Sequence, residues 1–162
     1  MTDLASVVVR AHPNIALAKY WGKCSGAGNF PSVPSLSVTL AGLATTTRLT
    51  FRDDLGADHL VLNGEEAEGE PVVRATRLLD RVRAASGMRG RAWIESSNDF
   101  PTASGLASSA SGFAALALAA TRAAGADWDA ARVADLARRG SASAARSLFG
   151  GFVELDGTPV RP

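Results

Sequence analysis

Lysine occurs at only two positions in this chain of 162 residues, and both lie in the pentapeptide Lys19-Tyr-Trp-Gly-Lys23. The other 15 basic residues are arginines. Because arginine serves wherever this chain needs a cation for solubility, two lysines four residues apart indicate a need for compact, mobile ammonium groups, as in phosphate binding. A solvated pair on a loop is the alternative. The pentapeptide is therefore a first candidate site for an anionic ligand.

A second candidate is the segment Pro101-Thr-Ala-Ser-Gly-Leu-Ala-Ser-Ser-Ala110, which is rich in glycine and serine and leads into an alanine-rich stretch. If that stretch is helical, its first N–H groups point outward with the positive end of the helix dipole. Small side chains then let a polyphosphate approach the backbone. No Gly-Lys-Ser/Thr follows, so this is not a Walker A loop. Tight packing alone also produces such helix starts.

The third candidate runs from Arg138 to Ser147 and combines small hydroxyl residues with arginines at an expected helix start. Arg146 is suited to bidentate hydrogen bonds with a phosphate or a carboxylate. Taken alone, a surface arginine on an ordinary turn explains this cluster equally well.

The elements that must position these candidates follow from hydrophobic periodicity and turn residues. The pattern predicts an α+β fold in a single domain, residues 1–162, with an irregular region from Pro13 to Pro34. The alternation at 35–40 and 45–52 predicts neighbouring half-buried strands, and Asn63-Gly64 predicts a tight hairpin turn. The expected strands are 6–11, 35–40, 45–52, 59–66 (as a hairpin), 91–96 and 151–155, and the expected helices are 71–85, 107–124, 129–139 and a short one at 143–149.

Charge and composition narrow the possible functions. The formal net charge is +1, so no overall field favours nucleic acid or anionic lipid. Seven acidic residues and no basic ones lie in 53–70, which leaves 17 basic against 9 acidic residues elsewhere, about +8, and favours an anionic ligand. One cysteine and two histidines provide no cluster for a transition metal.

No membrane span or secretion signal is expected. Residues 100–121 form a run of 22 without a charge, but four serines, two glycines, Pro101 and many alanines make it too weakly apolar to span a bilayer. We interpret it as a loop that leads into a buried helix of small residues. The first residues lack a basic region and an apolar core, so we expect a cytoplasmic location.

Five motifs in this order resemble the diphosphomevalonate decarboxylases, a family within the GHMP kinase superfamily. They are Asn14-Ile-Ala, Lys19-Tyr-Trp-Gly-Lys23, Pro34-Ser-Leu-Ser-Val-Thr-Leu40, the segment Asn98 to Ala110, and Arg146-Ser-Leu-Phe-Gly-Gly-Phe152. The resemblance covers nearly the whole chain. It implies the N-terminal domain of that superfamily, with the left-handed β-α-β crossover of ribosomal-protein-like domains.

The resemblance also implies a function, the ATP-dependent decarboxylation of mevalonate 5-diphosphate to isopentenyl diphosphate in isoprenoid biosynthesis. The tertiary hydroxyl is phosphorylated, and that phosphate then leaves together with CO2. ATP and Mg2+ are the implied cofactors, and mevalonate 5-diphosphate and ATP the implied ligands. A catalytic role falls on Lys19 and Asn14, which order the pocket. The implied substrate-binding residues are Tyr20, Trp21, Gly22, Lys23, Arg74, Ser141, Ala142, Ser143 and Arg146.

For ATP, the resemblance implies that the phosphates are wrapped by Ala103, Ser104, Gly105, Leu106, Ala107, Ser108 and Ser109. A hydroxyl of Ser108 or Ser109 would approach Mg2+. Several cations together with a helix dipole and Mg2+ suit a reaction that brings two polyphosphates into contact.

The sequence departs from the family pattern at three points. The family's catalytic aspartate belongs to a further C-terminal domain, and no aspartate here matches it, so we expect this chain alone to be inactive. Asp99 is expected to be structural, as is His12. Ala142 stands where glycine is usual between two serines, and Cys24 stands where arginine is more common.

Three alternatives remain open. The first is a related enzyme that acts on the monophosphate or that phosphorylates without decarboxylation. The second is a non-catalytic fragment or split subunit, whose exposed apolar patch would favour a homodimer. The third is nucleic-acid binding through the basic part of the chain, which the dispersed arginines disfavour.

Overall fold

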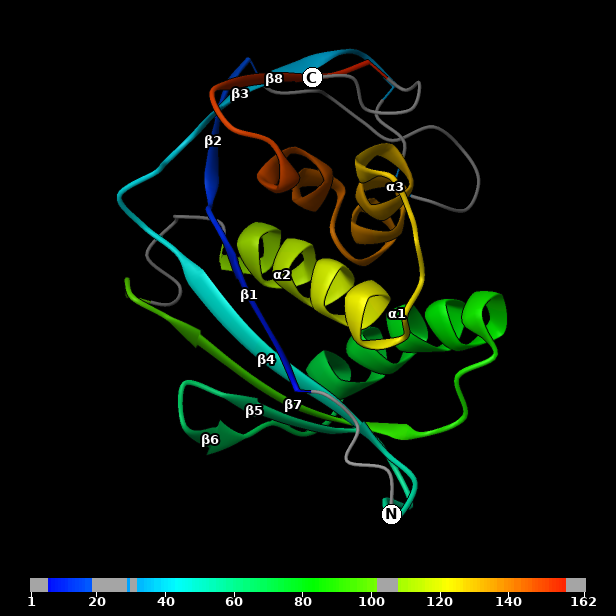
Figure 1. Cartoon of the computed structure of the whole chain (residues 1–162). Coiled ribbons are helices and arrows are strands. Elements are labelled where there is room, and N and C mark those ends of the chain that lie inside the picture. Colours follow the sequence, from blue (N-terminus) through cyan, green and yellow to red (C-terminus); the bar gives the residue numbers. More distant parts are fainter. Residues whose placement is uncertain (1–5, 19–28, 30–31, 102–107, 157–162) are drawn as a thin grey trace.

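The computed structural model describes residues 6–18, 29, 32–101 and 108–156 (Figure 1). The lysine pentapeptide, Cys24 and residues 102–107 lie outside the described residues.

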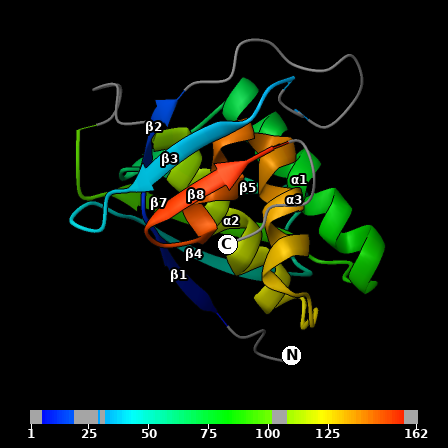
Figure 2. The same ribbon diagram turned by 90° about the horizontal axis from the view of Figure 1, so that it is seen from above.

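Two sheets form the outer layers of the fold. The larger sheet has the order β1-β4-β7-β5-β6 and contains β1 (Val7–Ala11), β4 (Thr45–Arg52), β7 (Arg91–Asn98), β5 (His59–Leu62) and β6 (Glu65–Glu66). The smaller sheet has the order β2-β3-β8 and contains β2 (Asn14–Ala18), β3 (Ser35–Thr39) and β8 (Phe152–Leu155). Figure 2 shows the smaller sheet lying over the helices.

The helices fill the space between the two sheets (Figures 1 and 2). They are α1 (Glu70–Ser86), α2 (Ser108–Ala123), α3 (Ala130–Gly140) and the short 3₁₀ helix η1 (Ala142–Leu148). The α2 helix packs against β1 and β4 on one side and against α3 and η1 on the other. Nine residues of α2 are buried, and most of them are alanine. A helix enclosed on all sides needs small side chains for close approach, which confirms the expected buried helix.

The α1 helix forms where local signals predict it. Pro71 lies in the first turn, where its missing N–H costs no hydrogen bond. Gly87 follows the last turn at φ 76°, and its N–H donates to the carbonyl of Arg83. This left-handed conformation is the one that glycine adopts without a Cβ penalty. The helix lies on the chain path from β5 to β7, two strands that pair in parallel, which gives a β-α-β crossover.

Two other local predictions are confirmed. Asn63 (φ 52°) and Gly64 (φ 87°) turn the chain from β5 to the antiparallel β6, as the Asn-Gly pair predicts. The helix expected over 129–139 forms as α3, and Asp129 is its N-cap, because its side chain accepts a hydrogen bond of 2.7 Å from the N–H of Arg132.

One expectation about the sheets is wrong. The strands at 35–40 and 45–52 are not neighbours, because β3 pairs with β2 and β8 whereas β4 pairs with β1 and β7. The chain changes sheets at a turn after β3, where the N–H of Leu40 donates to the carbonyl of Pro13 at 2.9 Å. The alternation predicted that each strand has one buried face but carried no information about which sheet buries it.

A strand was also missed. Residues 14–18, which were assigned to the irregular region, form β2 and pair with β3 in a register interrupted by a bulge between Ala16 and Ala18. The β2 strand forms because it pairs with β3. Its own five residues, which follow Pro13, have too weak a strand pattern to predict it from the sequence. The outward side chains of the smaller sheet include exposed Ile15, Leu36 and Phe152. Within the described part of the chain, the helices are too short and too weakly apolar for any of them to cross a membrane.

Candidate functional site

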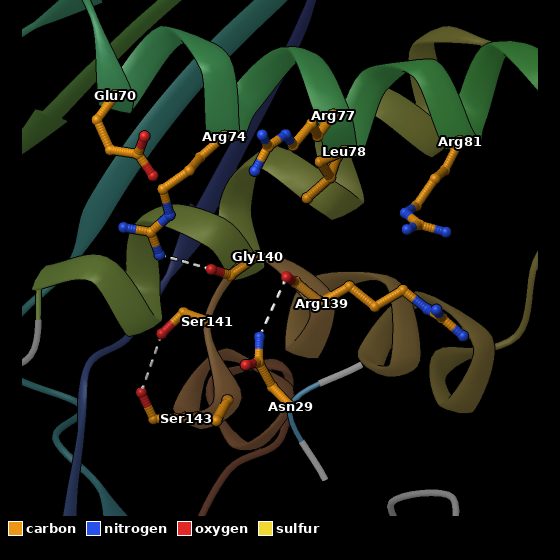
Figure 3. Close-up of a pocket in the computed structure, with 11 residues that line it drawn as sticks. Asn29, Glu70, Arg74, Arg77, Leu78, Arg81, Arg139, Gly140, Ser141 and Ser143 are labelled. Atoms are coloured by element: carbon orange, nitrogen blue, oxygen red, sulfur yellow. Dashed lines mark hydrogen bonds between the residues drawn. The ribbon is translucent and has the colours of Figure 1, made fainter. Parts of the chain in front are cut away.

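A cavity of about 570 Å³ opens between α1 and the junction of α3 with η1 (Figure 3). We call it the arginine cavity, because four arginines and a single carboxylate, Glu70, line it. Its walls bring together segments that lie almost 70 residues apart in sequence. The lining residues are Asn29, Glu70, Arg74, Arg77, Leu78, Arg81, Arg139, Gly140, Ser141, Ala142 and Ser143.

Arg74 is fixed in this wall by two contacts. Its Nη2 donates to the carbonyl oxygen of Gly140 at 2.5 Å, and its guanidinium carbon lies 4.6 Å from the centre of the Phe113 ring. The first contact ties α1 to the end of α3, and the second ties α1 to α2. A guanidinium held in this way presents a preorganised cation to the cavity.

Ser141 and Ser143 face Arg74 across the same cavity (Figure 3). Their hydroxyl oxygens lie 3.4 Å apart. Ala142, between them, is buried and starts η1 without a positive φ. The usual glycine at this position is therefore not required by backbone conformation in this chain.

Both flanks of the lysine pentapeptide are anchored at this region. On the N-terminal side, Asn14 in β2 donates from Nδ2 to the carbonyl of Ser143 at 3.0 Å and to Oγ of Ser147 at 2.7 Å. On the C-terminal side, Asn29 donates from Nδ2 to the carbonyls of Arg138 and Arg139, both at 3.2 Å. Asn29 itself lines the arginine cavity.

Asn14 and Arg146 form a buried layer behind the cavity and are absent from its lining. Asn14 is 3% exposed, and its Oδ1 has no hydrogen-bond partner among the described residues. Arg146 is also 3% exposed, and its Nη1 donates to Oγ of Ser35 at 2.6 Å. In the structure, Arg146 thus ties η1 to β3.

A second cavity, of about 290 Å³, adjoins the first, and Glu70 and Arg74 line both. We call it the apolar cavity, because its walls include Leu60, Leu62, Ile94, Phe113 and Leu116. Ser108 and Ser109, the first two residues of α2, also line it. It therefore combines a surface for a flat apolar group with the N–H groups of a helix N-terminus.

The start of α2 is held firmly against the larger sheet. Oγ of Ser111 lies 2.6 Å from Oγ1 of Thr45, and Thr45 also donates to Oδ1 of Asn98 at 2.6 Å. Residues 103–107, the rest of the expected ATP loop, lie outside the described residues.

The Asp135 carboxylate offsets part of the positive charge beside the arginine cavity. Nε of Arg139 donates to Oδ2 of Asp135 at 3.0 Å, and Arg138 also donates to Asp135. Partial burial raises the pKa of the Asp135 carboxyl, but the hydrogen bonds from these two arginines outweigh burial, so its pKa lies below its ordinary value.

Asp99 and His12 have the structural roles that were expected. Oδ1 of Asp99 accepts from the N–H of Ala44 at 2.6 Å, and Oδ2 accepts from Arg10 at 2.9 Å. The backbone hydrogen bond is the main reason why the pKa of Asp99 is lowered. Nδ1 of His12 donates to the carbonyl of Leu43 at 2.6 Å, at the turn between the sheets.

Arginines on the exposed face of the larger sheet are largely neutralised by carboxylates. Arg10 pairs with Asp99 at 2.9 Å, Arg48 with Glu95 at 3.7 Å and Arg52 with Asp54 at 2.6 Å. Nucleic acid is bound by clustered cations that are free to contact phosphates. These ion pairs therefore argue against this face as a nucleic-acid surface.

No three His, Cys, Asp or Glu side chains within the described ranges are grouped so that they could hold a metal ion. The hydroxyls of Ser108 and Ser109 remain the candidate oxygen ligands for Mg2+, with the Glu70 carboxylate on the wall of the same cavity. Oxygen donors of this kind, together with substrate phosphates, are what Mg2+ prefers.

Five residues that line the arginine cavity were not expected from the sequence: Asn29, Glu70, Arg77, Leu78 and Arg81. Arg139 and Gly140 lie within the third candidate segment, Arg138 to Ser147. The helical spacing of Arg74, Arg77 and Arg81 places them on one face and was a usable signal, but only Arg74 was assigned to the substrate, through the family resemblance. Nothing in the sequence indicated that α3 would close the opposite wall.

The structure is an α+β domain with two adjoining cavities, one of which is lined by four arginines. The family described as the diphosphomevalonate decarboxylase-like N-terminal domain matches residues 11–158, and the chain belongs to this family. The resemblance noted in the sequence and the expected fold class are thereby confirmed.

Three relatives illustrate the match. The phosphomevalonate decarboxylase of Haloferax volcanii is 44% identical over 146 residues, which cover 90% of this chain and 45% of that protein. The crystal structure of mevalonate diphosphate decarboxylase from Staphylococcus aureus superposes with a TM-score of 0.88 at 46% identity, over 94% of this chain and 46% of that one. A structure of MDDEF in complex with MVAPP, AMPPCP and magnesium superposes with a TM-score of 0.87 at 44% identity, with the same coverage. The chain spans less than half the length of each relative.

Proposed function

We propose that this chain is the ATP- and substrate-binding half of an ATP-dependent decarboxylase that converts mevalonate 5-diphosphate to isopentenyl diphosphate. The observation that supports this most is the junction of the two cavities at Arg74 and Glu70. The proposed phosphoryl transfer brings two anionic ligands, ATP and mevalonate 5-diphosphate, side by side, and a cation between them reduces their repulsion.

In this proposal the arginine cavity takes the substrate. Arg74, Ser141 and Ser143 line it and provide one guanidinium and two hydroxyls for phosphate or carboxylate oxygens. Asn14 and Arg146 act from behind, because their buried hydrogen bonds hold η1 and β2 in place. Lys19, Tyr20, Trp21, Gly22 and Lys23 complete the proposed substrate site from a segment whose flanks are anchored there.

The apolar cavity takes ATP in this proposal. Its apolar walls fit a purine, and the start of α2 with Ser108 and Ser109 fits the phosphates and Mg2+. Bound ATP supplies the phosphoryl group, and Mg2+ offsets its charge. The residues of this chain bind and orient both ligands and bring them together at Arg74.

The proposal is tested by calorimetry of the purified chain with Mg-ATP and with mevalonate 5-diphosphate. We expect both to bind, and we expect Arg74→Gln and Lys23→Ala to weaken binding of mevalonate 5-diphosphate at least about 10-fold, because each removes a charged partner of a phosphate. Arg89→Gln is the control, since Arg89 is exposed and absent from the lining of both cavities. A folded chain that binds neither ligand would contradict the proposal.

Two further outcomes are informative. Tighter binding of mevalonate 5-phosphate than of the diphosphate would favour an enzyme that acts on the monophosphate. The relative from Haloferax volcanii is named a phosphomevalonate decarboxylase. No carboxylate of this chain matches the catalytic aspartate that the resemblance implies, so we expect no isopentenyl diphosphate from these 162 residues alone. Formation of that product would contradict this part of the proposal.

A further inference from the structure

Three arginines follow one face of α1 along the arginine cavity. Arg74, Arg77 and Arg81 are spaced by three and four residues, which places them on the same side of a helix. Figure 3 shows Arg74 extending from α1 toward Gly140 and Arg81 extending from α1 toward the side of Arg139. Arg139 lies on the opposite wall and extends beneath Arg81. The cations therefore continue well beyond Arg74, the only one of the four that the resemblance assigns to the substrate.

Two of these outer arginines, Arg77 and Arg81, are not neutralised by the protein, and the third, Arg139, is paired with a carboxylate through one nitrogen only. Within the described part of the chain, Arg77 and Arg81 have no hydrogen-bond or ion-pair partner, in contrast to Arg83 on the same helix, which pairs with Asp58 and Asp80. Arg139 contacts Asp135 only through its Nε atom. Its two Nη groups thus remain available to a ligand, and the carboxylate holds its guanidinium in a fixed orientation.

The clustering works against the stability of the empty protein. Like charges three and four residues apart destabilise a helix, and Arg77 and Arg81 lie in the middle of α1, away from the C-terminal end where the helix dipole favours cations. The cluster also lines a concave surface, where the field of several cations is concentrated rather than dispersed into solvent. A multiply charged anion in this cavity would relieve the repulsion.

We propose that Arg77, Arg81 and Arg139 form an anion subsite that takes the terminal phosphate of a diphosphate and makes this chain select a diphosphate substrate over the corresponding monophosphate. The inference rests on the proposed function, because it assumes that the substrate lies in the arginine cavity. The first phosphate is then held at Arg74, Ser141 and Ser143, and the second extends along α1. A monophosphate would leave the outer guanidiniums without a partner.

The test uses the purified chain with inorganic pyrophosphate and inorganic phosphate as probes in calorimetry. We expect pyrophosphate to bind at least about 10-fold more tightly than phosphate, because each charged guanidinium adds strong hydrogen bonds to the second phosphate. In the double variant Arg77→Gln/Arg81→Gln this preference falls to about 3-fold or less, whereas phosphate binding and Mg-ATP binding each change less than about 2-fold, since Arg74 and the apolar cavity are untouched.

The matched control is Arg89→Gln/Arg91→Gln, which removes the same charge from exposed positions that do not line the cavity. It is expected to keep the wild-type preference. An equal loss in both double variants would show an effect of net charge alone and would overturn the inference, as would an unchanged preference in Arg77→Gln/Arg81→Gln or no pyrophosphate binding by the wild type.

Mevalonate 5-diphosphate and mevalonate 5-phosphate then separate this inference from the proposed function. If mevalonate 5-diphosphate binds no more tightly than pyrophosphate while the double variant still loses its preference, the subsite stands and the proposed substrate is wrong. If mevalonate 5-diphosphate binds tightly and the double variant discriminates against the monophosphate as the wild type does, the proposed function stands and the subsite is wrong.

Discussion

Nη2 of Arg74 donates to the carbonyl oxygen of Gly140 at 2.5 Å and thereby joins the first half of α1 to the last residue of α3. These two residues lie 66 positions apart in sequence. The same guanidinium faces the Phe113 ring of α2, so one side chain connects three helices at the wall of the arginine cavity. The geometry of the cavity therefore depends on how closely α3 approaches α2.

That approach requires glycine at position 140. A Cβ at this position would overlap the Phe113 ring. We expect Gly140→Ala to lower the free energy of unfolding by about 1–3 kcal/mol, because an extra methyl group in a packed contact forces its neighbours apart. It should also weaken binding in the arginine cavity, since Arg74 loses its position. Urea denaturation and calorimetry measure the two effects.

Gly112→Ala, in α2, is the control for this substitution. Apart from its chain neighbours and the nearby backbone of α2 itself, no described atom lies within 4 Å of a Cβ added at Gly112. The change is expected to stabilise the protein by up to about 1 kcal/mol, because alanine is the better helix former. Equal stability of the Gly140→Ala variant and the wild type would contradict the packing argument.

Asn14 is expected to stabilise the substrate side of the fold through its two donated hydrogen bonds. Asn14→Ala leaves the carbonyl of Ser143 and the hydroxyl of Ser147 without this donor, and we expect a loss of about 1–3 kcal/mol in unfolding free energy. Ser147→Ala removes only one of the two hydrogen bonds and should cost about 1 kcal/mol. A larger loss in Ser147→Ala than in Asn14→Ala, measured by urea denaturation, would show that Asn14 does not carry this connection.

The buried ion pair of Arg83 with Asp58, the residue before β5, is expected to hold the start of β5 against α1. The side chains are 10% and 2% exposed, Asp58 also accepts from the N–H of Ala92 at 2.8 Å, and Arg83 also donates to the carbonyl of Gly90 at 3.1 Å. Asp58→Ala leaves the Arg83 charge buried without its principal partner and is expected to cost about 3–5 kcal/mol.

Asp54→Ala provides the comparison, because Asp54 pairs with Arg52 at an exposed position, where the side chains are 66% and 46% exposed. We expect this variant to lose much less stability than Asp58→Ala, since solvent screens such an exposed pair. Thermal unfolding of both variants measures the contrast, and similar losses would rule out a special role for the buried pair.

The lowered pKa of Asp135 predicts that the protein loses stability in acid. Because its folded-state pKa lies below the ordinary value of about 3.9, the carboxylate stabilises the folded protein fully above that pH, and this contribution is lost as the pH falls through the lower folded-state value. Asp135→Asn should therefore be less stable than the wild type at pH 7, and the difference should shrink toward pH 3. Urea denaturation at the two pH values measures it, and a constant difference would contradict the prediction.

The sequence by itself determined the features that depend on neighbouring residues. Pro71 and Gly87 bound α1, Asn63-Gly64 turns the hairpin and Asp129 starts α3, because each of these residues acts on backbone within a few positions of itself. The motifs that carry the family resemblance were also complete in the sequence. They named Arg74, Ser141 and Ser143 as members of one site before the structure placed them together.

Only the tertiary structure decided which strands share a sheet and which arginines share a cavity. The alternation of β3 and β4 is similar, yet they belong to different sheets, because pairing is chosen by distant partners. On α1, Arg83 turns inward to Asp58, whereas Arg77 and Arg81 face Arg139 across the cavity. Whether each arginine is paired or lines the cavity depends on what packs against its face of the helix. Long-range packing decides this, and the spacing along the chain does not.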